Sequence, residues 1–240
     1  MPLFGGPEYG NPEDGGHELY PGVWEEPPTV EYKFQYIELG PSLGGFFPNQ
    51  NSILIREDYW ELLHHITRYQ QSVQGNKGAM ILTGHPGIGK SLFLYFTLVY
   101  RVLHGLPTAF EFKVGKIYYF GEKLKLYDTY DMIDPEGYPG AWALSDSNQV
   151  LHQPSGEFTT PLSRFFTLQA TSPQPIRWKT WSKYRGAEIY AMKLWSWEAI
   201  YTGARKFQDP GEFKDDVLWQ VFANYSKSAH KCYEMARHIQ

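Results

Sequence analysis

The chain has 240 residues, of which 42% are hydrophobic and 20% are charged, a composition typical of a globular domain with room for a sizeable core. The net charge of −4 excludes a strong overall attraction to nucleic acid or to acidic membranes. A single cysteine, Cys232, excludes an internal disulfide framework and a thiolate-rich zinc site. The sequence shows neither a signal peptide nor a long apolar run, which predicts an intracellular protein, cytoplasmic or nuclear.

The first part of the chain, residues 1–49, is predicted to be an acidic, Gly- and Pro-rich arm ahead of one domain at residues 50–240. Its first 31 residues contain seven acidic residues, six Gly and six Pro, but no Lys or Arg. Such a segment buries too little surface to offset its chain entropy, so we expect it to be disordered or loosely packed. The alternative is an acidic arm that binds a partner.

The domain alternates predicted helices and strands. An apolar stretch at 53–55 precedes an amphipathic helix that gives way to a loop at 70–78. Buried strands are predicted at 79–83, 108–112, 116–120, 141–144 and 165–170. Helices are predicted at 91–104, 197–202 and 215–225, with a short one after them. This alternation predicts an α/β fold, a three-layer sandwich with a mostly parallel central sheet as in P-loop NTPases.

The most specific motif is GHPGIGKS at residues 84–91, which matches G-x-x-x-x-G-K-[ST] without a mismatch. Glycines let consecutive backbone N–H groups point inward as an anion cradle, and the following helix adds its positive end. Lys90 is expected to reach the β- and γ-phosphates and Ser91 to help hold Mg²⁺. A turn that binds nothing would not need Lys90 and Ser91 together. The predicted nucleotide-binding residues here are Gly84, His85, Pro86, Gly87, Ile88, Gly89, Lys90, Ser91 and Leu92.

A phosphate loop needs a second acidic group on a neighbouring strand end. Asp146 directly follows an apolar run and is predicted to join Ser91 as a metal ligand. An ordinary turn aspartate is the alternative, because Asp-Ser-Asn is common in turns. Many hydrolysing P-loop proteins carry a glutamate after this aspartate, but here that place is Ser147. The base that activates water therefore stays unassigned; Asp131, Asp134 and Glu136 are upstream candidates.

Polar residues follow the next predicted strand. Ser172 comes directly after it, where such folds place a group that senses the γ-phosphate or water, and a purely structural hydroxyl is an equal alternative. Residues 177–206 contain seven basic and two acidic residues with Trp and Tyr between them, a pattern that single-stranded nucleic acid can exploit. Core aromatics with solvated basic neighbours are the favoured interpretation. Arg177 and Arg185 are candidates for stabilising transition-state charge.

Several of these patterns together resemble one protein group. They are Ile55-Arg56-x-x-Tyr59, the glycine motif, Trp142-Ala143-Leu144-x-Asp146-Ser147 and Ala170-Thr171-Ser172-Pro173. Over about residues 50–235 the chain is similar to fungal P-loop proteins, the ATPase modules of Crinkler-type and retrotransposon-hot-spot-type proteins, which are related to AAA+ and STAND NTPases.

The resemblance implies a nucleotide-binding module with Lys90 and Ser91 on phosphate and Mg²⁺, Asp146 as the second acidic group, and residues 51–59, including Arg56, near the adenine. Where relatives often have an arginine this chain has His230. It also ends with no room for a full helical lid, which argues against vigorous turnover.

The sequence therefore predicts binding and slow Mg²⁺-dependent hydrolysis of ATP or GTP, with Lys90, Asp146, Ser172 and Arg177 in catalytic roles. The alternative is a nucleotide-dependent module that binds protein or nucleic acid with little hydrolysis. A small-molecule kinase ranks lower because no arginine-rich lid is evident. A protein partner or self-association stays open, nucleic acid is not favoured, and no membrane is expected.

Overall fold

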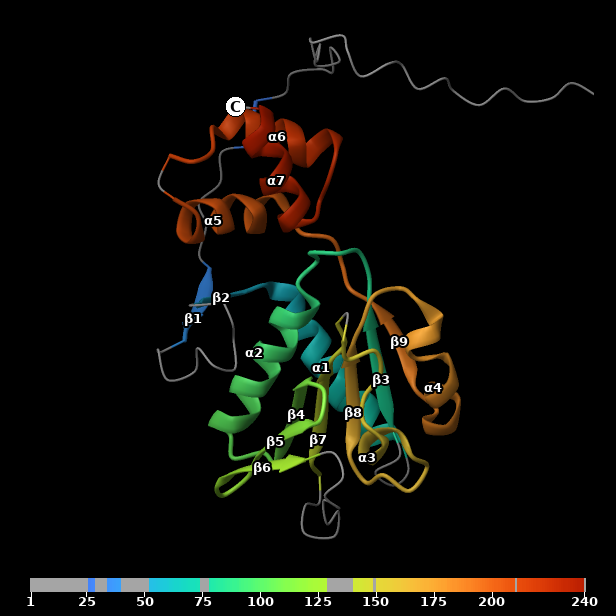
Figure 1. Ribbon diagram of the computed structural model, residues 1–240. Helices are drawn as coiled ribbons and strands as arrows, with labels where there is room; N and C mark the ends of the chain where they lie inside the picture. The colour runs from blue at the N-terminus through green and yellow to red at the C-terminus, as the bar shows by residue number, and fades with distance from the viewer. Residues whose placement is uncertain are drawn as a thin grey trace, which may run out of the picture.

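The computed structural model describes residues 26–28, 34–39, 52–73, 78–128, 140–148, 150–209 and 211–239. Within these residues the main sheet has seven strands in the order β6-β5-β4-β7-β8-β3-β9 (Figure 1). The strands of this sheet are β3 (Ala79–Thr83), β4 (Thr108–Lys113), β5 (Lys116–Phe120), β6 (Leu124–Asp128), β7 (Trp142–Asp146), β8 (Phe166–Ala170) and β9 (Glu188–Ala191). The helices are α1 (Glu57–Ser72), α2 (Lys90–Leu103), α3 (Gly156–Thr159), α4 (Lys179–Arg185), α5 (Trp197–Phe207), α6 (Asp215–Asn224) and α7 (Ala229–Ile239).

Most of the sheet is parallel. Strands β4, β7, β8, β3 and β9 pair side by side in the parallel sense. Strands β5 and β6 extend it as antiparallel neighbours at one edge. The predicted α/β class with a mostly parallel central sheet is thus confirmed, although the strand predicted at 116–120 joins in the antiparallel sense.

Helices cover both faces of the sheet. On β3, Met80 and Leu82 belong to the core under α1 and α2, whereas Ala79 and Ile81 pack with Trp181 of α4 on the opposite face. This alternation is what a strand buried on both sides requires. The layering of helices, sheet and helices is compatible with the predicted three-layer sandwich.

Helix α1 packs closely on α2 through aromatic side chains, among them Tyr59 against Phe93 with ring centroids 5.3 Å apart. It continues to Ser72, so the predicted loop at 70–78 begins too early. In the described residues no helix is both long and apolar enough to cross a membrane.

A small antiparallel pair precedes α1. It joins β1 (Gln35–Glu38) to β2 (Ser52–Ile55). β1 falls within the stretch predicted as the N-terminal arm; apart from residues 26–28 and 34–39, that stretch lies outside the described residues.

The sequence analysis missed β1, β6, α3, α4 and β9, and the reason is clear for three of them. β6 is largely exposed and mixes polar with apolar residues, so it lacks the apolar run of a buried strand. α4 and β9 lie inside the basic-aromatic segment. In α4, Trp181 is buried against the sheet while Lys183 faces outward, as the favoured interpretation of core aromatics with solvated basic neighbours expects.

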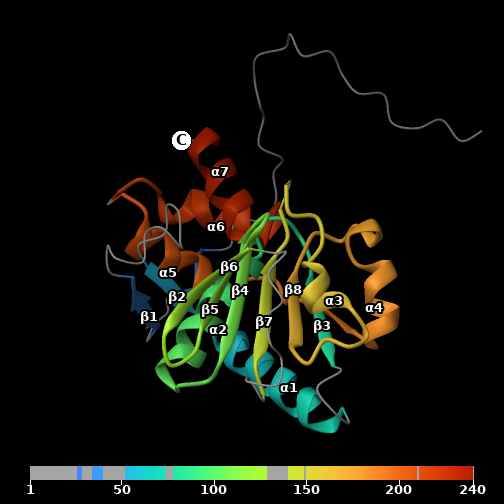
Figure 2. The same cartoon turned by 60° about the horizontal axis from the view of Figure 1, so that its bottom comes forward.

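Helices α5, α6 and α7 form a helical cap, the name used for them below, beside the end of the sheet where β3 leads into α2 (Figures 1 and 2). Trp197, Leu218 and Cys232 contribute buried side chains from the three helices. The three helices predicted in this part of the chain are thus present, and the absence of a full helical lid stays a prediction. These helices are short, but each presents an apolar face to the others, which a pattern search within single helices does not reveal.

A buried arginine holds the end of the sheet at which its parallel strands begin. Arg185 of α4 is 3% exposed and donates hydrogen bonds to the carbonyls of Ser163 (2.6 Å), Gly78 (3.4 Å) and Phe165. These residues precede β8 and β3, so Arg185 lies at the amino ends of the strands. Replacing it would leave several buried carbonyls without a donor.

We expect Arg185→Met to lower the free energy of unfolding by about 2–4 kcal/mol, because it removes a charged donor from buried carbonyl groups. Urea denaturation measures the change. Lys183→Met on the same helix is the matched control, since Lys183 is exposed, and it should change the value by about 0.5 kcal/mol at most. Equal losses of unfolding free energy in both variants would contradict a stabilising role for the hydrogen bonds of Arg185.

Candidate functional site

The glycine motif, residues 84–91, forms the turn between β3 and α2, and is called the glycine loop below. It stands at the carboxyl end of β3, with Lys90 as the first residue of α2. Gly87 and Gly89 have φ angles of 72° and 99°, which side chains other than glycine rarely adopt. The loop therefore has the strand–turn–helix setting that the motif needs.

Lys90 folds back over its own loop. Its ammonium group donates hydrogen bonds to the carbonyls of Gly84 (3.1 Å) and His85 (3.0 Å). Burial lowers the pKa of Lys90, while the negative charge of Asp146 opposes that shift. A partly buried ammonium with only carbonyl partners is well placed to meet an anion.

Ser91 and Asp146 meet although 55 positions separate them in the chain. The Ser91 hydroxyl donates to Asp146 Oδ1 over 2.9 Å, and Tyr95 of α2 also hydrogen-bonds to this carboxylate. Burial raises the pKa of Asp146 to about 6, while Ser91, Lys90 and Tyr95 act in the opposite direction. Tyr95 was not among the predicted residues; its place one helical turn after Ser91 is the signal that could have found it.

These oxygen donors fit Mg²⁺. Ser91 Oγ and Asp146 Oδ1 lie 2.9 Å apart in a hydrogen bond, and hydroxyl and carboxylate oxygens are ligands of the kind that Mg²⁺ takes. Among the residues that the structure describes, no group of three or more His, Cys, Asp or Glu side chains could hold a metal ion. A magnesium ion here would take its remaining ligands from phosphate and water.

Three hydroxyl groups near the carboxyl ends of β3 and β8 have no hydrogen-bond partner among the described residues. They belong to Thr83, Thr171 and Ser172, and all are buried. β8 lies between β3 and β7 in the sheet, so Ser172 follows a strand that separates the glycine loop from Asp146. Buried hydroxyls without partners are uncommon, and a bound ligand or water would satisfy them.

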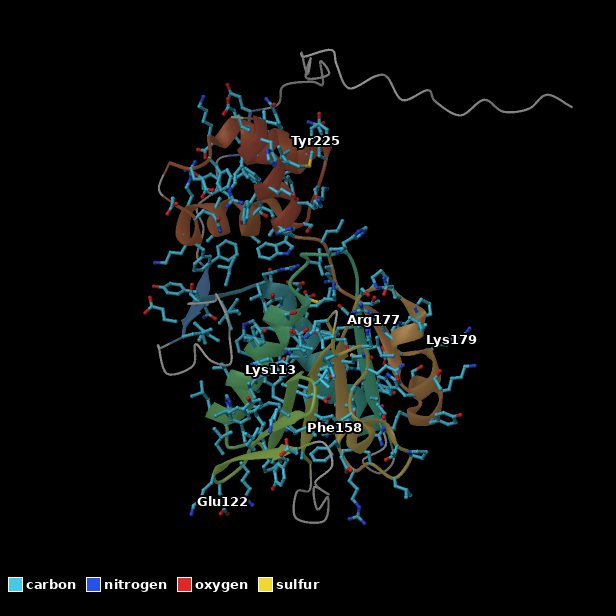
Figure 3. The ribbon with its side chains drawn as sticks, viewed as in Figure 1. Lys113, Glu122, Phe158, Arg177, Lys179 and Tyr225 are labelled. Carbon is cyan, nitrogen blue, oxygen red and sulfur yellow. The ribbon has the colours of Figure 1, made fainter. Side chains whose placement is uncertain are left out.

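Arg177 lies beyond β8 in the short 3-10 helix Pro175–Arg177, on the side of the sheet near α4 (Figure 3). Its Nε donates to Gln174 over 3.1 Å, and its own carbonyl accepts a hydrogen bond from Gln169. The structure thus brings Lys90, Ser91 and Asp146 together, whereas the guanidinium of Arg177 is bonded to Gln174. Arg185 is no longer a candidate for stabilising transition-state charge, because it lies at the amino ends of the strands and the glycine loop lies at their carboxyl ends.

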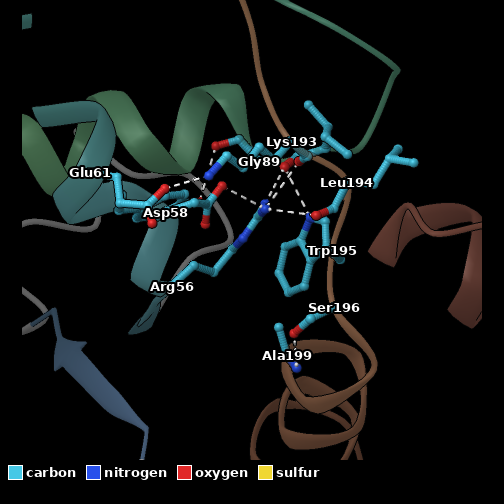
Figure 4. A network of polar contacts seen from close by, with 11 residues as sticks. Arg56, Asp58, Glu61, Gly89, Lys193, Leu194, Trp195, Ser196 and Ala199 are labelled. Atoms are coloured by element: carbon cyan, nitrogen blue, oxygen red, sulfur yellow. Dashed lines mark hydrogen bonds and ion pairs between the residues drawn. The ribbon is translucent and has the colours of Figure 1, made fainter. Parts of the chain in front are cut away.

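Arg56 is enclosed by protein groups. It is 3% exposed, donates to the Ile88 carbonyl of the glycine loop over 2.8 Å, and pairs with Asp58 at 2.8 Å. It also donates to the carbonyls of Lys193 (3.1 Å) and Leu194 (3.3 Å) (Figure 4). Its donors therefore face the backbone of the loop and of the segment that leads into α5.

Glu111 is an acidic residue that the sequence analysis missed. It lies on β4 opposite Ser145 of β7, is 1% exposed, and accepts a hydrogen bond from the Ser155 N–H over 2.9 Å. Burial raises its pKa to about 7, although the Ser155 and Ser145 hydrogen bonds oppose this. The only sequence signal is one acid inside an apolar strand.

The upstream candidates for a water-activating base, Asp131, Asp134 and Glu136, lie outside the described residues. Among the described residues, Glu111 stands on the strand next to that of Asp146. It lies on the opposite face, since its partner Ser145 immediately precedes Asp146. Ser147 shares that face, and its hydroxyl accepts from Gln169 over 2.6 Å.

A cavity of about 440 Å³ opens between the glycine loop and the cap. It is lined by His85 and Pro86 of the loop, by residues 222–228 at the end of α6 and in the turn before α7, and by Leu194 and Lys231. Its wall combines aromatic rings and polar side chains, as small-molecule sites do.

A second cavity, of about 370 Å³, adjoins Arg56 and Lys193. Its wall also carries the acidic residues Glu57, Asp58, Glu61 and Glu198. This cavity suits an anionic ligand less than the first does, since four carboxylates face two cations.

Comparison with known proteins adds no assignment: no family model matches the chain, and no curated protein has a significantly similar sequence.

Glu111 should make the stability of the protein depend on pH. A carboxyl group with a higher pKa in the folded chain holds its proton longer there than in the unfolded chain. The free energy of unfolding should therefore fall as the pH rises from about 4.5, the ordinary value, to about 7.

Urea denaturation of wild type and Glu111→Gln across this range isolates the effect. Relative to the variant, the wild type should lose roughly 2–3 kcal/mol between the two pH values. Parallel pH profiles for the two proteins would show that Glu111 titrates normally.

Proposed function

We propose that this protein binds a nucleoside triphosphate, ATP or GTP, with Mg²⁺ and hydrolyses it slowly, as a P-loop NTPase. The observation that carries the proposal is the meeting of Ser91 and Asp146 at 2.9 Å beside Lys90. A glycine turn without a ligand has no need for a carboxylate from another strand at this point. The similarity to Crinkler-type and retrotransposon-hot-spot-type ATPase modules agrees with this proposal and is part of it.

The protein's own groups have distinct tasks in this proposal. Backbone N–H groups of the glycine loop bind the phosphate oxygens, and Lys90 exchanges its carbonyl partners for the β- and γ-phosphates. Ser91 and Asp146 hold Mg²⁺, which when bound neutralises charge on the phosphates. Ser172, with its buried unpartnered hydroxyl, orients water or the γ-phosphate.

The cavity between the loop and the cap is the proposed site for the nucleoside. It adjoins His85 and Pro86, so a nucleoside attached to loop-bound phosphates can enter it. Phe222 and Tyr225 offer aromatic surface and Asn224 offers an amide that can pair with a base edge. This placement differs from the implied role of Arg56 near the adenine, because the Arg56 donors are directed at backbone carbonyls.

Slow turnover follows from the lack of an acid after Asp146. Ser147 cannot act as a strong base, and Glu111 is the buried carboxylate on the next strand. Glu111 lies on the sheet face opposite Asp146 and already accepts a hydrogen bond from the Ser155 N–H over 2.9 Å, so we assign no side chain of the described residues as the base.

A nucleotide-dependent binding module is the second candidate. The observation in its favour is that Glu111 and the hydroxyl of Ser147 both have protein partners already, Ser155 and Gln169 respectively. In this case the triphosphate would be held with little hydrolysis, and the cap would be the element that a bound nucleotide orders for a partner.

Binding is tested by the thermal unfolding midpoint with and without ATP or GTP in the presence of Mg²⁺. Saturating nucleotide at about 100 times its Kd should stabilise the wild type by about 2.7 kcal/mol, and Lys90→Ala should lose most of this gain. Lys123→Ala is the matched control, because Lys123 is exposed in the β5–β6 turn, at the end of the sheet away from the glycine loop. If neither nucleotide protects the wild type, both candidate functions fail.

Hydrolysis is tested by steady-state phosphate release from the same proteins. The wild type and Lys123→Ala should exceed Lys90→Ala. Equal release by wild type and Lys90→Ala, with nucleotide still bound by the wild type, would leave only the binding module.

A further inference from the structure

The outward carbonyls of the glycine loop are held by side chains from other parts of the chain. The Ile88 carbonyl accepts two hydrogen bonds, from Arg56 Nη1 over 2.8 Å and from Trp195 Nε1 over 2.9 Å. The Gly89 carbonyl accepts one from the Tyr59 hydroxyl over 3.2 Å, in addition to the helical bond from the Phe93 N–H over 2.9 Å. Figure 4 shows Arg56 between the start of α1 and the segment that carries Trp195.

The cap holds the loop at a further carbonyl. Ser228, just before α7, donates its hydroxyl to Pro86 O over 2.8 Å. The same stretch is tied to the segment before α5, because Trp195 N–H donates to the Lys227 carbonyl over 2.9 Å. His230 of α7 lies against Gly87. The loop is therefore hydrogen-bonded both by Ser228 next to the cap and by Tyr59 of α1.

These contacts have a consequence for the opposite side of the loop. In a planar trans peptide the C=O and the following N–H point in opposite directions. Fixing the carbonyls of Pro86, Ile88 and Gly89 outward turns the N–H groups of the residues after them, Gly87, Gly89 and Lys90, to the other side. Inward N–H groups are what an anion cradle consists of.

The glycines show how close the grip is. A Cβ atom at Gly89 would lie 2.8 Å from the Tyr59 hydroxyl, and one at Gly87 would lie 2.9 Å from Ser228 Oγ. Both distances are too short for real side chains. Glycine at these positions therefore leaves space for the hydroxyl groups of Tyr59 and Ser228, in addition to leaving the loop backbone open to a ligand. The motif glycines thus have a second structural reason that the pattern alone does not reveal.

Arg56, at the start of α1, links the glycine loop to the segment that precedes the cap. Its guanidinium stacks on the Trp195 ring, with 4.7 Å to the centroid, and bonds the loop through Ile88 and the segment before α5 through Lys193 and Leu194. A planar, multiply donating guanidinium can make this set of contacts, whereas a lysine cannot.

We propose that Tyr59, Trp195 and Ser228 are positioning residues that orient the N–H groups of the glycine loop for phosphate, so that the cap completes the binding loop and nucleotide affinity depends on the contact between them. This proposal rests on the proposed function for its ligand. It extends that function by making the cap and the segment before it a structural part of the phosphate site, although Ser228 lies 138 and Trp195 lies 105 positions after Lys90.

The test uses variants that each remove one donor and keep most of the side-chain volume: Tyr59→Phe, Trp195→Phe and Ser228→Ala. Tyr69→Phe is the matched control, because the Tyr69 hydroxyl also donates to a backbone carbonyl, that of Gly186 at 2.7 Å, away from the loop. Calorimetric titration with Mg·ATP and Mg·GTP measures affinity, and amide hydrogen exchange of residues 85–91 without nucleotide measures the order of the loop.

Each of the three variants should bind both nucleotides roughly 5- to 10-fold more weakly, the effect of one lost hydrogen bond, and should exchange the loop amides faster. Tyr69→Phe should match the wild type within about two-fold. Equal losses for ATP and GTP are expected, because the change acts on the phosphates and not on the base.

Wild-type affinity in the three variants would overturn the proposal while leaving the proposed function intact. Losses as large in Tyr69→Phe would also overturn it, since general loosening would then explain them. If the wild type binds neither nucleotide, the proposed function fails and hydrogen exchange alone decides: unchanged loop exchange in the variants rejects the positioning role, and faster exchange supports it.

Discussion

Five neighbouring strands of the sheet run parallel: β4, β7, β8, β3 and β9. The residues that follow these strands therefore all lie at one end of the sheet, the carboxyl end. The candidate site depends on that constraint. It brings the turn after β3, the hydroxyls after β8 and the carboxylate at the end of β7 into one region, although they are far apart in sequence. Ser91 and Asp146 can meet at 2.9 Å only because their elements share this end.

The part of the site that the sequence could predict is local. β3 and α2 have the predicted bounds to within one residue, because an apolar run, a glycine turn and a second apolar run leave few other arrangements. Asp146 was accessible to the same reasoning, since it ends an apolar run. Whether it is a metal ligand remains a proposal, supported by its contact with Ser91.

The rest depends on long-range packing that local patterns do not encode. Nothing near Ser228 signals a bond to the Pro86 carbonyl 142 positions earlier. Glu111 was missed because one acid in an apolar strand has no periodicity, and its partners, Ser145 and the Ser155 N–H, come from distant parts of the chain. Arg56 was placed near a base by resemblance, but its donors are engaged by Asp58 and by backbone carbonyls that only the fold brings within reach.

The central claim is that the N–H groups of the glycine loop bind phosphate, and backbone amide NMR during a titration with Mg·ATP tests it most directly. Large shifts of the Gly87, Gly89, Lys90 and Ser91 amide resonances are expected, and they should saturate together with a single Kd. Shifts confined to other parts of the protein, or none at any concentration up to the millimolar range, would contradict it.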